Sequence, residues 1–104
     1  MSQVKVINGD LYVIFEEYGD NTLMSYKLDN GAEVDFFYND SGEVKVAQLV
    51  LPKFEAQINR GSLDNVPMEL VDAQVTDEEK MILSIKILND TINITLDYSS
   101  MQNI

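Results

Sequence analysis

Hydrophobic and polar residues alternate with a period of two along most of this chain. The clearest case is the run 91–98, in which Ile, Ile, Leu and Tyr alternate with Thr, Asn, Thr and Asp. The runs 11–15, 24–28 and 32–38 also place apolar residues at every second position. This period predicts half-buried β-strands that turn one face toward a core and the other toward water.

Clusters of Gly, Asn and Asp separate the apolar runs. Gly9, Gly19, Gly31 and Gly42 recur every 10–12 residues, each within two residues of an Asn or Asp. Gly and Asn tolerate the positive φ angles of tight hairpin turns. This spacing predicts an all-β fold, an antiparallel meander of seven to nine short strands that forms a small barrel or a two-sheet sandwich.

Two runs change their inward face partway along. In 43–51 the apolar positions are first even-numbered and then odd-numbered, and the change falls near Ala47 and Gln48. The run 66–75 changes in the same sense at Val71. A β-bulge, or a bend from one sheet into another, accounts for such a shift. Offset strands of this kind are what a small barrel or an orthogonal sandwich requires.

Two segments fit either a strand or a short helix. Near 53–61 Phe, Ala and Ile alternate as in a strand, which we favour, whereas Pro52 and Gly61 are placed to begin and end a helix. Near 77–88 the leading Thr-Asp-Glu-Glu sequence matches a helix capping box. The clean alternation of Met, Leu, Ile and Ile that follows favours a strand there as well.

The composition indicates one globular domain that spans residues 1–104. Hydrophobic residues make up 45% of the chain, which is enough to build a core. The 18 Asp and Glu residues outnumber the 7 Lys and Arg residues and give a formal net charge of −11. This charge is distributed along the whole chain rather than concentrated in a tail, and it points to a basic partner protein.

The side chains that are missing narrow the possible chemistry. The sequence contains no His and no Cys, which removes Ser-His-Asp and Cys-His catalytic arrangements, zinc-thiolate sites and disulfides. The acidic turns around Asp29 and Asp40 consist of residues that hairpins favour, so we predict no metal site and no cofactor. We therefore predict that the protein is not an enzyme.

The basic residues and the apolar runs argue against two kinds of ligand. Seven widely separated Lys and Arg residues are too few for direct binding to a nucleic-acid backbone. The apolar runs are too short to cross a membrane, and the first residues lack the apolar core of a signal peptide. We therefore predict a cytoplasmic protein that binds neither nucleic acid nor membrane.

Two groups of residues are candidates for binding a partner. One group lies at the end of a predicted strand, and the other lies on the outward face of the strand 32–38. The residues are Glu16, Glu17 and Asp20 in the first group, and Glu33, Asp35 and Phe37 in the second. An aromatic side chain beside carboxylates is a common interface arrangement. The alternative is that a loop or a second layer covers the aromatic ring.

These features favour a non-catalytic acidic binding protein that caps a basic surface of a partner protein. An inhibitor, an immunity protein or an anti-defence protein would fit, including one that imitates the charge of nucleic acid. Two alternatives are a structural or assembly module of a larger particle and a β-barrel that binds a small molecule.

Overall fold

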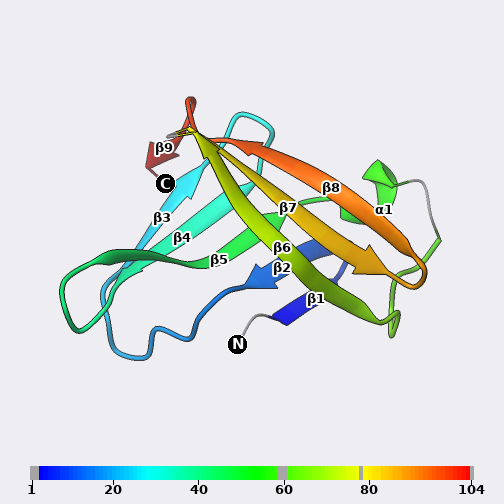
Figure 1. Ribbon diagram of the computed structural model, residues 1–104, viewed down its shortest axis with the longest axis horizontal. Coiled ribbons are helices and arrows are strands. Elements are labelled where there is room, and N and C mark those ends of the chain that lie inside the picture. The colour runs from blue at the N-terminus through cyan, green and yellow to red at the C-terminus, as the bar shows by residue number, and fades with distance from the viewer. Residues whose placement is uncertain (1–2, 59–60, 78, 104) are drawn as a thin grey trace.

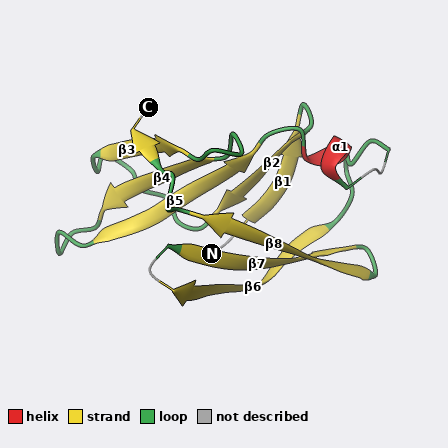
Figure 2. Ribbon diagram, turned by 90° about the horizontal axis from the view of Figure 1, so that it is seen from above, coloured by secondary structure: helices red, strands yellow, loops and turns green. Residues whose placement is uncertain are grey.

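The chain folds into two stacked antiparallel β-sheets with a short helix at one end (Figures 1 and 2). A computed structural model describes residues 3–58, 61–77 and 79–103. The first sheet has the strand order β1-β2-β5-β4-β3-β9, and the second has the order β6-β7-β8. The elements are β1 (Gln3–Ile7), β2 (Asp10–Ile14), β3 (Leu23–Lys27), β4 (Glu33–Tyr38), β5 (Val44–Leu51), α1 (Phe54–Gln57), β6 (Met68–Asp77), β7 (Lys80–Ile87), β8 (Asp90–Asp97) and β9 (Gln102–Asn103).

The inward residues of both sheets form one core. Leu11, Val34 and Leu49 of the first sheet and Leu83 and Ile85 of the second are each at most 1% exposed. Burial of an apolar side chain of this size contributes about 1.5–3 kcal/mol to folding. The predicted all-β class is confirmed. Across the described residues the sheets stack as an open sandwich and do not close into a barrel.

The strand order departs from a simple meander at one point. β2 pairs with β5 rather than with β3, so the meander order holds within β3-β4-β5 and within β6-β7-β8. The loop 15–22 therefore carries the chain from β2 past β5 and β4 to β3. Hairpin signals in the sequence are local, and they do not specify which strand joins the free edge of the first hairpin.

Both predicted shifts of register are confirmed as β-bulges. In β5, Val46 pairs with Phe36 and Gln48 pairs with Asp35, which leaves Ala47 as the extra residue. The carbonyl of Ala47 accepts the N–H of Phe15 at 2.9 Å, so the bulge holds the start of the loop 15–22. In β6 the same shift leaves Val71 unpaired. A bulge bends a strand and increases its twist, which suits a sandwich with crossed sheets.

The strand that we favoured at 53–61 is wrong, because α1 occupies this place. Lys53 has a left-handed backbone with φ of 55°, and it turns the chain away from the sheet after β5. The next residue, Phe54, is 1% exposed, and its N–H donates to the Gly9 carbonyl at 2.7 Å. The helical turn thus inserts an aromatic ring into one end of the core. The helix ends at Gln57 with Ile58 as its C-cap, before Gly61, which the alternative interpretation gave as its end.

The strand that we favoured within 77–88 is confirmed. β7 pairs along its whole length with β6 on one side and with β8 on the other. The capping-box sequence before it belongs to the β6-β7 hairpin, where the N–H of Glu79 donates to the Asp77 carboxylate at 2.8 Å. Glu78 lies outside the described residues.

Candidate functional site

The outward face of β4 holds one of the two predicted binding groups, but it presents less to a partner than we expected. Glu33, Asp35 and Phe37 share this face because they are alternate residues of one regular strand, opposite alternate residues of β3. Phe37 is only 3% exposed, so its predicted role as a displayed aromatic is wrong. The ring of Tyr18, from the loop 15–22, lies 6.3 Å from the Phe37 ring. The loop covers the ring, which is the alternative that the sequence left open.

Asp35 is a buried carboxylate whose hydrogen-bond partners come from the neighbouring strands. Its exposed fraction is 9%. The hydroxyl of Ser25 on β3 donates to one carboxylate oxygen at 2.7 Å, and the side-chain amide of Gln48 on β5 donates to the other at 3.2 Å. These bonds join three adjacent strands across the sheet. Asp35 therefore stabilises the fold, while the half-buried Glu33 stays a candidate for binding.

The first predicted group lies at one end of the six-stranded sheet. Glu16, Glu17 and Asp20 are all exposed in the loop 15–22. The loop leads into Leu23, which pairs with Phe37 near the end of β4. From there β4 continues into the 39–43 hairpin. Figure 1 shows this loop and this hairpin side by side at one end of the long axis. We call this end, residues 16–23 and 38–45, the tip.

Exposed hydrophobic side chains also gather at the tip. Of the nine large hydrophobic residues that are exposed in the described part of the chain, four belong to it, so the tip holds a larger share than its length would give. Tyr18 and Leu23 lie on the outer face of the sheet, and Tyr38 and Val44 pair with each other on the inner face. Their exposed fractions run from 37% for Tyr18 to 53% for Val44.

Near the tip, the inner face of the first sheet extends beyond the second sheet (Figure 1). In one row of paired residues, Met24, Phe36 and Val46 are half-buried, and in the next row outward Tyr38 and Val44 are exposed. Phe36 and Val46 also pack against the core. We call these five residues the uncovered inner face. Figure 1 shows why: the second sheet crosses in front of the first at an angle and leaves the tip ends of β3, β4 and β5 without a second layer.

Charge at the tip is strongly negative. Five carboxylates stand against one lysine, and that lysine, Lys45, forms an ion pair with Glu43 at 3.6 Å. Both side chains of this pair are largely exposed, so the pair contributes little to stability. The carboxylates of the tip are Glu16, Glu17, Asp20, Asp40 and Glu43. Acidic groups around exposed aromatic and aliphatic side chains are suited to binding a basic protein surface.

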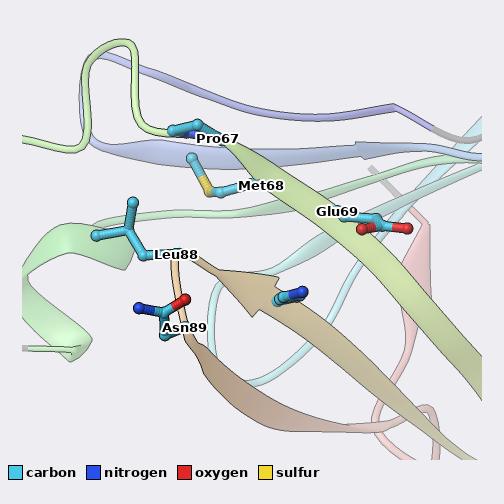
Figure 3. Close-up of a pocket in the computed structure, with 6 residues that line it drawn as sticks. Pro67, Met68, Glu69, Leu88 and Asn89 are labelled. Carbon is cyan, nitrogen blue, oxygen red and sulfur yellow. The ribbon is translucent and has the colours of Figure 1, made fainter.

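A second surface feature is a hollow of about 460 Å³ at the far end of the second sheet (Figure 3). Met68 and Leu88 supply apolar wall, while Glu69 and Lys86 bring one charge of each sign. Pro67 and Asn89 complete the lining. Because the opposite charges offset each other, this hollow has no electrostatic preference for a basic partner.

The end of β8 carries two titratable groups with shifted pKa values. The hydrogen bond from the Ser99 side chain lowers the pKa of Asp97 most, and the bond from the Ser99 backbone lowers it further. Burial raises the pKa of Tyr98, the residue after β8. Asp97 lines a smaller hollow of about 200 Å³ beside the β3-β4 turn. No cluster of three or more acidic residues in the described part of the chain is arranged to hold a metal ion. No helix among those residues is long and apolar enough to span a membrane.

Comparisons with known proteins add no family to this picture: neither family models, nor curated proteins, nor solved structures show a significant match. What the tip can bind therefore follows from its own residues. Alternation in the sequence placed Tyr38 on an inward face, and it gave no signal that Tyr38 and Val44 stay exposed. Tyr18 carried a weak signal, because it interrupts an acidic run.

Proposed function

We propose that this chain is a non-catalytic acidic binding protein that caps a basic surface of a partner protein. The role is that of an inhibitor, an immunity protein or an anti-defence protein, whose carboxylates take the place of nucleic-acid phosphates on the partner. We take this protein to act in the cytoplasm. The observation that carries it is the tip, where five carboxylates surround four exposed hydrophobic side chains.

The two components of the tip have different physical roles in this proposal. Carboxylates attract a basic surface over about a Debye length, which raises the rate of association and makes it sensitive to salt. Exposed aromatic side chains such as Tyr38 then lose water against the partner and supply most of the affinity. The rest of the −11 charge strengthens the attraction without contacting the partner.

Capture of a partner at two salt concentrations tests the proposal. The purified chain is immobilised, exposed to a lysate of its source cells at roughly 50 mM salt and eluted at roughly 500 mM, because screening removes attraction between exposed charges. The expected result is a basic protein in the eluate that binds again as a purified pair. A chain that retains no basic protein, or retains one equally at both salt concentrations, would contradict the proposal.

Matched variants then locate the interface on the purified pair. Tyr38→Ala at the tip is expected to weaken binding roughly five-fold or more, as loss of an interface anchor does. Leu88→Ala is the control, because Leu88 is exposed at the far end. For charge, Glu17→Lys is compared with Glu69→Lys, and only the first should slow association markedly. Equal effects at both ends would show that the tip is not the interface.

The assembly-module alternative has one observation in its favour, the exposed edge of β6 described below. Sedimentation over a wide concentration range separates it from the proposal, since a module that assembles with itself forms oligomers and a capping protein stays a monomer until its partner is added. The small-molecule alternative depended on a closed barrel, which the described strands do not form.

A further inference from the structure

The second sheet ends in a long strand, β6, and among the described residues no other strand pairs with β6 on the side away from β7. β6 pairs with β7 on one side only, and it is an edge strand of the sheet. All residues from Val71 to Asp77 are exposed, including Val71 at 56% and Val75 at 69%. Exposed valines on a sheet edge are unusual, because a free edge pairs readily with other strands and is normally protected.

The pairing of β6 with β7 shows which face of the second sheet these side chains point to. Ala73 pairs with Leu83 and Val75 pairs with Met81, and directly opposite residues point to the same face of a sheet. Leu83 is fully buried in the core. Ala73 and Val75 therefore face inward, toward the first sheet. Both stay exposed, and no strand of the described residues pairs with β6 on its open side.

The uncovered inner face lies on this open side of β6 (Figure 1). Figure 1 shows β6 crossing in front of β5, with the tip ends of β3, β4 and β5 continuing past it on the side away from β7. Figure 2 shows the two sheets as separate layers, with β6 in the layer opposite those strands. A further strand beside β6, spaced by about 4.8 Å, would extend the second layer toward Met24, Phe36 and Val46.

We propose that the partner protein adds an extended segment to the free edge of β6 as a fourth strand of the second sheet. This inference rests on the proposed function and specifies how the partner is held. Backbone hydrogen bonds to β6 supply affinity, and alternate side chains of the added strand supply specificity. Its inward side chains are apolar, because they lie beside Ala73 and Val75 and face the row of Met24, Phe36 and Val46.

The charge of β6 identifies the outward side chains of the added strand as Lys or Arg. Asp72 and Gln74 alternate with the inward residues Ala73 and Val75, so their side chains point to the outward face of the sheet. A basic residue opposite Asp72 is favourable, whereas a carboxylate there is repelled. A second copy of this chain is a poor occupant for the same reason, because each copy brings a charge of −11 and its own acidic β6 edge.

The free edge is protected until such a segment arrives. Bulges at Val71 and Thr76 interrupt the ladder on either side of the regular stretch 72–75. Within it, the Asp72 carboxylate accepts the N–H of Ala73 at 2.9 Å. A Lys or Arg on the added strand gives this carboxylate a new partner and releases the Ala73 N–H for an incoming carbonyl. A strand without a basic residue lacks this means of opening the edge.

The test uses the full chain and synthetic eight-residue peptides. The probe peptide alternates Val with Lys, and the two controls alternate Val with Glu or carry Pro at two of the Val positions. Amide hydrogen exchange and NMR shifts are measured with each peptide. The Val-Lys peptide is expected to slow exchange at 72–75 roughly ten-fold or more and to shift Met24 and Val46, because new backbone bonds protect amides. Neither control should do so.

Two variants of the chain provide a matched comparison. Val75→Lys puts a charge on the inward, exposed face of the edge and is expected to weaken peptide binding roughly ten-fold, since inward charges block strand addition. Gln74→Lys makes the same charge change on the outward face of the neighbouring residue and should weaken it roughly three-fold or less. Both positions are exposed, so both variants should fold as the wild type does.

Each contrary result has a distinct meaning. Absent binding of the Val-Lys peptide, or binding without protection of 72–75, overturns strand addition. If the salt-sensitive partner is captured and Tyr38→Ala weakens that complex, the proposed function stands even then. Protection of 72–75 without peptide, together with dimers in sedimentation, would instead assign the edge to a second copy of this chain and also overturn the proposal.

Discussion

Asp35 illustrates how a single acidic residue can serve the fold rather than a partner. Its carboxylate is 9% exposed and accepts hydrogen bonds from Ser25 and Gln48. A buried acceptor with two donors is well satisfied, and removing it leaves those donors without an acceptor. Glu17, which also carries a carboxylate, is exposed to solvent. Charge alone therefore does not mark a binding residue in this chain.

Asp35→Ala is expected to lower the free energy of unfolding by about 1–3 kcal/mol, because a charged acceptor of two buried hydrogen bonds is lost. Urea denaturation of the variant and the wild type measures this. Glu33→Ala is the control, a half-buried carboxylate on the same face and the same strand, and it should cost about 0.5 kcal/mol or less. Equal losses for both variants would show that the general charge of this face matters and the hydrogen bonds do not.

At the scale of elements, backbone geometry determines where each strand and turn delivers its side chains. The Ala47 bulge allows β5 to bury Leu49 and Leu51 after exposing Val44, and it also holds the loop that covers Phe37. The turn between β7 and β8 contains a residue in an unfavourable backbone conformation. Leu88 has a left-handed backbone with φ of 55°, yet 55% of its side chain is exposed.

Leu88→Asn is expected to raise the free energy of unfolding by about 1 kcal/mol, since a left-handed backbone costs most L-residues about 1–2 kcal/mol and Asn tolerates it. Thermal or urea denaturation measures the change. Leu23→Asn is the matched control, because Leu23 is also exposed but lies in a strand without a positive φ, and this variant should be destabilised. A loss of stability in Leu88→Asn would mean that the contacts of Leu88 at the hollow outweigh the backbone strain.

At the scale of the whole molecule, the charge of −11 opposes folding while it favours binding. Repulsion among carboxylates raises the free energy of the compact state, and one ion pair within the described residues, Lys45–Glu43, offsets little of it. Part of the charge belongs to turns. Asp29 and Asp40 lie in hairpin connections, where Asp is favoured for conformational reasons.

Stability is therefore expected to rise as NaCl is increased from roughly 10 mM to roughly 500 mM, because screening shortens the range of the repulsion. The midpoint of thermal unfolding at constant pH measures this. A chain in which Glu17, Asp20 and Asp40 are changed to their amides should show a smaller rise, since fewer charges are left to screen. A midpoint that is flat or falls with salt would contradict this account of the charge.

The sequence was sufficient to predict most strands, most turns and both shifts of register, although it left each shift open as a bulge or a bend. Alternation at 91–98 and the register change at Ala47 arise from side-chain direction along one strand, which is a local property. The same locality explains the error at 53–61. Phe, Ala and Ile alternate there, but the left-handed Lys53 turns the chain into a helix that buries Phe54 in the core, and alternation carries no information about that burial.

The tertiary structure alone decided which strands pair and how far each sheet covers the other. The second sheet stops short of the tip, so Tyr38 and Val44 on an inward face stay exposed, while a loop from β2 buries the outward Phe37. Burial depends on neighbours that are distant in the sequence, and alternation within a strand carries no information about them. The sequence by itself therefore determined the faces of the strands, and only the packing of the two sheets determined which faces are free to bind.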